Sequence, residues 1–391
     1  MLVRKIGIAW FLSRLGVTIA VAGRPPQVPL SIPDNAGSNV SIELFDDLEE
    51  LSRIVDIAYC VGTAGLGIQK PFLCASRCQD FKSFELVKTW NTGPLLSDSC
   101  GYVALSHPPS VPRIIVAFRG TYSIANTIID LSTLPQDYIP YPGSNHKEHA
   151  EDGSKSLPNP LPRLADPASS RCDNCMVHAG FMASWRHTRP QIIDQLDNLL
   201  IQYPNYQVTL VGHSLGGAVA ALASLDFHAK GWNPQVTTFG EPRVGNHALM
   251  KYIDKAFYHE SQSNRSVAYR RVTHIGDPVP QLPLKEWGYR THGEELYISK
   301  VNLPPERSDV RVCRGDDDRH CLAGADVSSD GSRSQRVPSA DMGSFTRGML
   351  EHAGNFEIPA RFRIWQLFFA HRDYFWRLGL CIPGGDPHDW K

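Results

Sequence analysis

Apolar residues recur along this chain with two different periods, and each period predicts a type of element. From Leu44 to Ala58 they recur every three or four residues, which predicts an amphipathic helix that ends near Cys60. The same spacing returns over residues 181–203 and predicts a second helix. Because proline lacks an N–H and crowds the preceding turn, we expect Pro190 to kink or break this helix.

Shorter apolar runs predict strands. The stretches FELVKTW and GYVALSH alternate apolar and polar residues, as strands with one exposed face do. The run RIIVAF, residues 113–118, is continuously apolar and predicts a buried central strand. Further strands are expected at residues 207–211, at QVTTFG and at YRRVTHIG, with a helix over 216–229. Since strands alternate with helices, we predict an α/β fold with a mainly parallel central sheet flanked by helices.

Three segments have no such period. Residues 23–40 are rich in proline and are interpreted as a leader or pro-segment. Residues 141–170 are polar and Pro-rich, and residues 323–345 are rich in Ser, Asp and Gly, so both are predicted to be flexible loops. The catalytic or binding domain is expected to be a single unit over 41–391.

Residues 1–22 are typical of a secretory signal peptide. Lys5 precedes an apolar stretch, and residues 20–22, Ala-Val-Ala, have the small-x-small form of a signal-peptidase site. Arg14 interrupts the apolar stretch, so an uncleaved N-terminal anchor is the alternative. We therefore expect the protein to be secreted.

The charge balance argues against highly charged partners. The chain has 39 Lys and Arg residues and 40 Asp and Glu residues, which gives a net charge of −1. Without a basic field, neither nucleic acid nor an anionic membrane surface is expected to be attracted by charge. Its 42% hydrophobic and 20% charged residues are ordinary for a soluble globular protein.

Nine cysteines in an exported chain indicate disulfides. Cys60 and Cys381 could join the two ends of the domain, which leaves Cys100 as a free and buried thiol. Cys74 with Cys78 and Cys172 with Cys175 also have the spacing of zinc ligands. A zinc site is therefore the alternative, although an oxidising compartment disfavours it. The pairs that are close in the sequence are Cys74 with Cys78, Cys172 with Cys175, and Cys313 with Cys321.

The stretch QVTLVGHSLGGAVAALASL places a serine between a predicted strand and a predicted helix. Its residues 212–216, Gly-His-Ser-Leu-Gly, follow the G-x-S-x-G pattern of a nucleophile elbow. The glycines allow a sharp turn, and the amides at the helix N-terminus can stabilise an oxyanion. Ser214 is therefore the candidate nucleophile.

A serine hydroxyl needs a base and an orienting acid, and in this type of fold both follow the serine, the acid first. Asp277 comes directly after a predicted strand, at the same sheet edge as Ser214. For the base, His371 lies in the most apolar downstream stretch, close to Cys381, although spacing alone does not choose among the later histidines. The weaker candidates for the acid are Asp226, Asp254 and Asp309.

From Ile42 to Gly385 the chain resembles the class 3 family of secreted fungal triacylglycerol lipases. Matching stretches include VAFRGT, CDNCMVHAGF, TFGEPRVGN, RVTHIGDPVPQLP and AHRDYFWRLGLC, in the family's order. The resemblance implies an α/β-hydrolase fold and hydrolysis of lipid esters through an acyl-enzyme, without a metal or organic cofactor. It implies Ser214 as nucleophile, Asp277 as acid and His371 as base, with His352 in EHAGNF as the alternative base.

The resemblance implies further roles. Thr121 and Leu215 would form the oxyanion hole. The segment at about 122–135 would be a lid whose apolar helical face enters lipid, and the alternative is a short helix packed permanently on the core. The apolar lid residues are Ile124, Ile128 and Leu131. The implied disulfides are Cys60–Cys381, Cys74–Cys78, Cys172–Cys175 and Cys313–Cys321.

We therefore expect a monomeric, secreted serine lipase that acts on triacylglycerols at an oil–water interface and touches the lipid surface transiently through its lid. Among enzymes, the alternatives are a soluble-substrate esterase of the feruloyl esterase type, which shares the C-x-x-C-x-V-H-x-G region, and a phospholipase A1. From another class, the alternative is a non-catalytic lipid-binding homologue.

Overall fold

The computed structural model describes residues 40–62, 67–93, 98–121, 135–140, 172–260, 265–313, 318–325 and 370–382. Several predictions concern residues outside these ranges. They are the signal peptide, nearly all of the leader, the lid residues Ile124, Ile128 and Leu131, the loop 141–170 and the alternative base His352. Of the predicted loop 323–345, the first three residues are described and end the short helix α6 (Leu322–Ala325).

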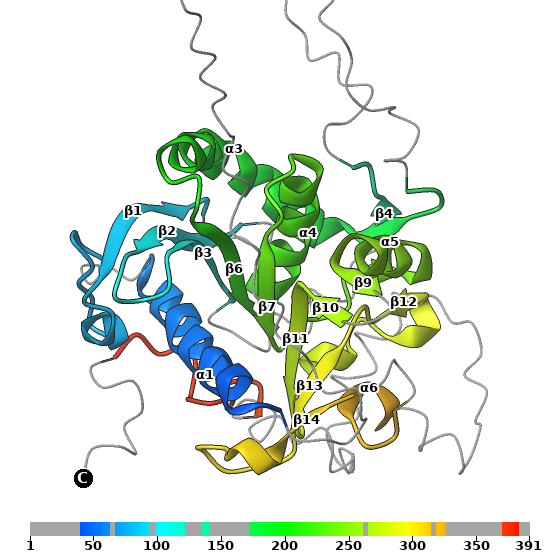
Figure 1. Cartoon of the computed structure of the whole chain (residues 1–391). Helices are drawn as coiled ribbons and strands as arrows, with labels where there is room; N and C mark the ends of the chain where they lie inside the picture. The colour runs from blue at the N-terminus through cyan, green and yellow to red at the C-terminus, as the bar shows by residue number, and fades with distance from the viewer. Residues whose placement is uncertain are drawn as a thin grey trace, which may run out of the picture.

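The centre of the molecule is a large twisted sheet (Figure 1). Its five strands from β3 to β13 pair in parallel, whereas β1, β2 and β14 pair antiparallel. The prediction of a mainly parallel central sheet is therefore confirmed, and the carboxyl ends of its middle strands meet at one edge. In spatial order the strands are β1 (Phe84–Asn91), β2 (Cys100–Ser106), β3 (Arg113–Arg119), β6 (Gln207–His213), β7 (Gln235–Phe239), β11 (Tyr269–His274), β13 (Glu295–Ile298) and β14 (Val310–Val312).

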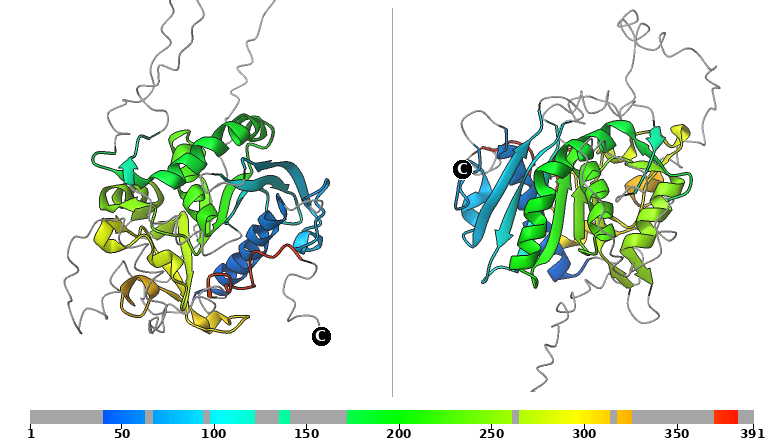
Figure 2. Two further views of the ribbon diagram at one scale, coloured as in Figure 1. Left: turned by 180° about the vertical axis from the view of Figure 1, so that it is seen from behind. Right: turned by 90° about the horizontal axis from the view of Figure 1, so that it is seen from above.

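Helices cover both faces of this sheet (Figure 2). Along β3, Ile114 and Val116 contribute to the core shared with α3 (Ala179–Gln202), α4 (Leu215–Ala229) and α5 (His247–Phe257). Ile115 and Ala117, between them, contribute to the core shared with α1 (Ile42–Ile57). Successive side chains of a strand point to opposite faces, so β3 is apolar throughout because it is covered on both sides.

All three predicted helices are present as α1, α3 and α4, one of them with a difference. Helix α1 begins after Ser41, whose hydroxyl accepts a hydrogen bond from Leu44 N at 3.1 Å, and it continues as a 3-10 turn to Cys60 as expected. Helix α3 runs continuously through Pro190, so of the predicted kink or break, the break is wrong. Packing on α4 overrides the tendency of proline to end a helix. Before the proline, Arg189 pairs with Asp226 of α4 at 2.6 Å, and after it the helix is held by buried side chains.

The strand β2 also differs from its prediction. GYVALSH was expected to expose one face, but β2 is buried on both. Val103 and Leu105 pack on the side of α3 and α4, while Tyr102 and Ala104 pack on the side of α1. The strand lies between β1 and β3, under helices on both faces, and small or aromatic residues at the alternate positions fit that space.

Two smaller sheets and several short turns complete the fold. All of their strand pairs are antiparallel. In the described part of the chain, no helix is both long and apolar enough to cross a membrane. One sheet contains β12 (Tyr289–Arg290), β8 (Gly245–Asn246), β5 (Met176–His178) and β4 (Pro135–Asp137), and the other contains β9 (Tyr258–Glu260) and β10 (Arg265–Val267).

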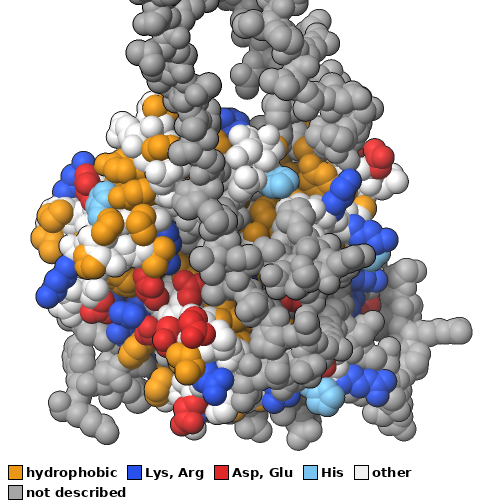
Figure 3. Space-filling model, viewed as in Figure 1, with side chains coloured by type: hydrophobic (Ala, Val, Ile, Leu, Met, Phe, Trp, Pro, Cys, Tyr) orange, Lys and Arg blue, Asp and Glu red, His pale blue; other side chains and the backbone are white. Residues whose placement is uncertain are grey.

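Acidic side chains gather on the face of the molecule that carries α1 (Figure 3). Several of them are paired with arginines of the sheet. Asp47 accepts from Arg270 of β11 at 2.8 Å and lies 3.6 Å from Arg113 of β3, and Glu50 also pairs with Arg113. Both arginine side chains are buried, so these pairs fasten α1 to β3 and β11, the outer two of four neighbouring strands.

Four disulfides are formed, with the pairing expected from the sequence. Cys100 is a buried free thiol. The cysteines of the alternative zinc site are bonded in pairs, and among the described residues no group of His, Cys, Asp and Glu is arranged to hold a metal ion. The disulfides are Cys60–Cys381, Cys74–Cys78, Cys172–Cys175 and Cys313–Cys321.

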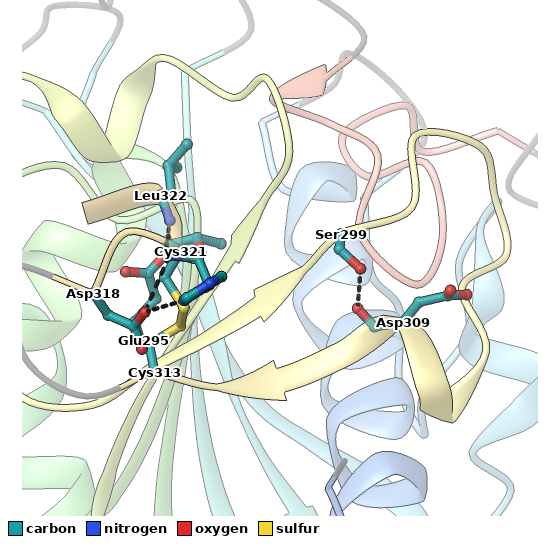
Figure 4. Close-up of a disulfide and its surroundings, with 9 residues drawn as sticks. Glu295, Ser299, Asp309, Cys313, Asp318, Cys321 and Leu322 are labelled. Atoms are coloured by element: carbon teal, nitrogen blue, oxygen red, sulfur yellow. Dashed lines mark hydrogen bonds and ion pairs between the residues drawn. A yellow bond between two sulfur atoms is a disulfide. The ribbon is translucent and has the colours of Figure 1, made fainter. Parts of the chain in front are cut away.

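Two of these disulfides fasten segments beside the main sheet. Cys313–Cys321 closes a loop beside β13 and β14, where Glu295 Oε1 accepts from Leu322 N at 3.0 Å (Figure 4). Cys60–Cys381 ties the end of α1 to the C-terminal segment, which runs along α1 in Figure 1.

Candidate active site

Ser214 lies in the turn between β6 and α4, at the carboxyl edge of the parallel strands. Its φ of 57° and ψ of −130° fall in a region that residues other than glycine rarely occupy. Such a conformation costs about 1–3 kcal/mol and persists only where the surrounding structure enforces it. Here Ser214 N donates to Phe239 O at 2.9 Å, so the end of β7 holds the turn. The backbone at the predicted position thus has the form of a nucleophile elbow.

The glycines on both sides of Ser214 are sterically required. A Cβ on Gly212 would lie 2.3 Å from the carbonyl oxygen of Gly216. A Cβ on Gly216 would lie 2.4 Å from the carbonyl oxygen of Phe118. No side chain fits at either distance, because in both cases the obstacle is backbone. The G-x-S-x-G spacing is therefore a packing requirement of this turn.

Asp277 and His371 form a buried pair at the same edge of the sheet. His371 Nδ1 lies 3.0 Å from each carboxylate oxygen of Asp277. The carboxylate also accepts from the Tyr374 hydroxyl at 2.5 Å and from Val279 N at 2.9 Å. Since a carboxylate only accepts, Nδ1 carries the proton, and Nε2 of the neutral ring is left as a proton acceptor.

Contacts on two sides put His371 beside the serine turn. The ring of His213, the residue before Ser214, has its Nε2 2.7 Å from the carbonyl oxygen of His371. A Cβ on Gly240, the residue after Phe239, would lie 3.0 Å from His371 Cε1. His371 Nε2 is buried and has no hydrogen-bond partner among the described residues. Its bond to a nucleophile would form when substrate binds, as is common in substrate-free sites.

The turn after β3 approaches Ser214 from the other side. A Cβ on Gly120 would lie 2.8 Å from Cβ of Ser214, so the backbone at this turn touches the serine. Thr121 follows directly. Leu215 is the first residue of α4, where the positive end of the helix dipole lies. Leu215 thus directly follows the serine, and Thr121 directly follows the glycine whose backbone touches it.

Burial keeps several groups around the pair uncharged. The pKa of His213 lies well below its usual value because the ring is buried and because His371 is close. The pKa of Tyr374 is raised well above its usual value by burial and by the carboxylate of Asp277. Burial also lowers the pKa of His274. The carboxylate of Asp277 is therefore solvated by neutral donors rather than by competing charges.

The weaker acid candidates are engaged elsewhere. Asp226 of α4 pairs with Arg189, and Asp254 of α5 accepts from Gly293 N at 2.7 Å. Asp309 lies in a 3-10 turn and accepts from the backbone N–H of Glu306 at 2.7 Å. None of the three faces a histidine of the serine turn. Of the acid candidates, Asp277 is the one that the structure brings to His371.

Three residues beside the site were not singled out from the sequence: Tyr374, His213 and Tyr59. Tyr374 lies three positions after His371, in the AHRDYFWRLGLC stretch that carries part of the resemblance to the lipase family. The Tyr59 hydroxyl lies 2.5 Å from His213 Nδ1 although the two residues are 154 positions apart. The sequence gives one indication that Tyr59 lies near the site. Tyr59 directly precedes Cys60, and the expected disulfide of Cys60 with Cys381 brings the end of the first helix to the segment of His371.

Comparison with known proteins agrees with this geometry. Residues 115–287 match the family model described as lipase (class 3). The chain is 51% identical over 365 residues to secreted mono- and diacylglycerol lipase 2 of Gibberella zeae, with 90% of this chain and 85% of that protein covered. It is 48% identical over 394 residues to lipase A of Sodiomyces alcalophilus, with 95% and 90% covered.

Solved structures agree as well. The Lip2 lipase of Yarrowia lipolytica matches with a TM-score of 0.65 at 29% identity, over 88% of this chain and 97% of that one. This likeness confirms the α/β-hydrolase fold. Identity of about half over most of both sequences, with the same fold, leaves one assignment: the chain belongs to the class 3 lipase family.

Proposed function

We propose that this protein is a secreted serine hydrolase that cleaves acyl esters of glycerol, with Ser214 as nucleophile, His371 as general base and Asp277 as orienting acid. The observation that carries the proposal is the buried Asp277–His371 pair beside the strained turn of Ser214. Export agrees with the name of the secreted Gibberella zeae relative and with four disulfides, which form in oxidising compartments.

In this mechanism Ser214 Oγ attacks the ester carbonyl carbon while its proton passes to His371 Nε2. The negative charge that develops on the carbonyl oxygen is stabilised by the backbone N–H groups of Thr121 and Leu215. The ester bond then breaks, and the alcohol leaves with the proton from Nε2, which gives an acyl-enzyme. Water then attacks the carbonyl carbon of the acyl-enzyme while its proton passes to His371 Nε2. The bond to Ser214 Oγ breaks, Oγ takes the proton from Nε2, and the fatty acid leaves. Asp277 accepts from Nδ1–H throughout and stabilises the imidazolium.

For the substrate, we propose mono- and diacylglycerols. The sequence alone led to an expectation of triacylglycerols, but the Gibberella zeae relative is named for the mono- and diacyl esters. A partial acylglycerol has one or two free hydroxyl groups beside the scissile ester, so it sits closer to water than a triacylglycerol does. The preference for partial acylglycerols over triacylglycerols would depend on the shape of the cleft that holds the substrate at Ser214.

We further infer that a single copy of the chain works at the surface of lipid aggregates. The predicted lid residues Ile124, Ile128 and Leu131 lie outside the described residues, and their role remains a prediction. An apolar helical face next to the candidate oxyanion turn would place the opening of the site against lipid. Thr121 directly precedes this segment in the sequence.

The test is hydrolysis of emulsified monoolein, diolein and triolein, with soluble p-nitrophenyl butyrate for comparison, by wild type and Ser214→Ala. We expect faster hydrolysis of the partial acylglycerols, and a loss of roughly 10³-fold or more in the variant. Activity on the soluble ester alone would move the protein to the soluble-substrate esterases. A wild type that neither hydrolyses any ester nor reacts with an organophosphonate would be a non-catalytic homologue.

A further inference from the structure

His213, the residue before Ser214, lies between the other parts of the candidate site. Its Nε2 is 2.7 Å from the carbonyl oxygen of His371, and its Nδ1 is 2.5 Å from the Tyr59 hydroxyl. A carbonyl oxygen only accepts, so Nε2 must carry the proton. Nδ1 of the neutral ring then accepts, and the Tyr59 hydroxyl donates to it. The two contacts together fix both the tautomer and the orientation of this ring.

Tyr59 extends the same connection to the turn after β3. Its side chain is buried at the end of the first helix. The backbone amide of Gly120 hydrogen-bonds to the Tyr59 hydroxyl, and a Cβ on Gly120 would lie only 2.5 Å from it. The ring of Tyr59 also packs on the C-terminal segment, since a Cβ on Gly379 would lie 3.3 Å from its Cε1. One hydroxyl therefore joins the Gly120 turn to His213.

We propose that Tyr59 and His213 are positioning residues, a Tyr59–His213 clamp that holds the Thr121 turn, the Ser214 turn and the His371 segment in one arrangement. The proposal rests on the function proposed above. Each of the three parts comes from a different region of the chain. The clamp contacts the backbone of two of them, at Gly120 and at His371 O, and His213 belongs to the third. A shift of about 1 Å between such parts is enough to slow catalysis about a hundredfold.

The clamp also has an electrostatic consequence. The rings of His213 and His371 are tilted by 31° with centroids 4.7 Å apart. A charged His213 would repel the imidazolium that forms on His371 in each half of the reaction. With Nδ1 occupied by the Tyr59 hydroxyl and Nε2–H by a carbonyl, the ring is held neutral. The clamp thus places a histidine next to the base without placing a second positive charge there.

The first test compares Tyr59→Phe with Tyr102→Phe. Tyr102 is a matched control because its buried hydroxyl donates to Ile54 O at 2.8 Å, in the same apolar cluster but without a contact to the site. On p-nitrophenyl butyrate we expect Tyr59→Phe to lower kcat about 10-fold to 100-fold with KM changed less than about twofold. Tyr102→Phe should keep kcat within about twofold although it loses a similar hydrogen bond. Equal kcat in Tyr59→Phe and wild type would overturn the proposal.

Variants at His213 separate the two bonds. Glutamine carries an amide near the position of Nε2 and can still donate to the His371 carbonyl, whereas asparagine reaches the position of Nδ1 and can still accept from Tyr59. We expect kcat to follow the order wild type, His213→Gln, His213→Asn, because the bond to the His371 segment is the one that orients the base. Asparagine equal to or better than glutamine would contradict a clamp that acts through that carbonyl.

A readout without turnover keeps this inference apart from the proposed function. In histidine-labelled protein, we expect a slowly exchanging Nε2–H signal of His213, identified by its loss in His213→Asn. It should be absent or fast-exchanging in Tyr59→Phe and unchanged in Tyr102→Phe. A signal unaffected by Tyr59→Phe would overturn the clamp even if Ser214-dependent hydrolysis is found. A wild type that keeps the signal but hydrolyses no ester would overturn the proposed function instead.

Discussion

The Tyr374 hydroxyl donates to Asp277 Oδ2 at 2.5 Å, on the same carboxylate that faces His371. The carboxylate thereby accepts from three donors, the side chains of Tyr374 and His371 and the backbone N–H of Val279. A carboxylate with so many donors has little freedom to rotate, and its orientation fixes that of the imidazole. The position of His371 is thus set through Asp277 as much as by its own segment.

Replacing this tyrosine should therefore loosen the pair. We expect Tyr374→Phe to lower kcat about tenfold and to lower the free energy of unfolding by about 1.5–3 kcal/mol, the usual loss for a buried hydrogen bond to a charged group. Ester hydrolysis and chemical denaturation measure the two effects. A variant with reduced stability and unchanged kcat would show that Tyr374 supports the fold without orienting Asp277.

Asp277→Asn should be far more severe. An asparagine amide can turn its NH₂ group toward Nδ1 and so favour the tautomer with the proton on Nε2, which cannot accept from Ser214. We expect a loss of about 10⁴-fold in kcat. The melting temperature should fall as well, because the NH₂ group replaces an oxygen that accepts from Tyr374 or Val279 N. Asp254→Asn, at another candidate acid that bonds Gly293 instead, should retain activity. If the two variants behave alike, Asp277 is not the orienting acid.

The two candidate bases can be distinguished directly. We expect His371→Ala to lose at least about 10³-fold in kcat, since no proton acceptor would remain beside Ser214. His352→Ala should hydrolyse p-nitrophenyl butyrate at a rate within about twofold of wild type. The opposite pattern would transfer the role of base to His352.

The tight turn predicts a stability effect. In Gly216→Ala the new methyl group would meet the carbonyl oxygens of Phe118 and Arg119 at 2.4 and 2.6 Å, so backbone must move. We expect a loss of about 3 kcal/mol in stability together with loss of activity. Gly67→Ala is the matched control, because a Cβ there has no neighbour within 4 Å. A normal melting temperature for Gly216→Ala would contradict the required close approach.

Acid should destabilise the protein through its buried histidines. The pKa of His213 lies well below the usual 6.5, and that of His274 is also lowered, because burial disfavours the charged rings. As pH falls below about 6.5 the unfolded chain binds protons that the native state does not, so stability is complete above this pH and declines below it. Each histidine contributes up to about 1.4 kcal/mol per pH unit. The melting temperature of His274→Gln between pH 7 and pH 5 should therefore fall less steeply than that of wild type.

Much of the fold could be predicted because its signals are local. The strand–turn–helix around Ser214 is contained in one stretch. Asp277 follows the stretch YRRVTHIG, which is predicted to be a strand without any knowledge of its neighbours. Where a prediction failed, the deciding contact was distant. Helix α3 continues through Pro190 because it packs on α4, and β2 is buried because helices cover both of its faces.

The remainder of the candidate site depends on contacts between distant segments. The neighbouring Cys60 indicates that Tyr59 lies near the segment of His371, but not that its hydroxyl bonds His213. Nothing around Tyr374 indicates that its hydroxyl meets Asp277. Both are tyrosines whose local surroundings predict core packing. Their polar ends acquire partners only after the sheet has brought three regions of the chain to one edge.

The bond between Cys60 and Cys381 spans 321 positions, and it fastens the segment that carries His371 to the helix that opens the domain. A chain that is still being synthesised therefore holds its serine turn long before it holds its base. Competence to cut esters therefore requires that the C-terminal segment be in place, and the bond that fastens this segment closes in an oxidising compartment. For most of its assembly the enzyme therefore lacks part of its candidate site, and during that time the membranes of the cell that makes it face an incomplete catalyst.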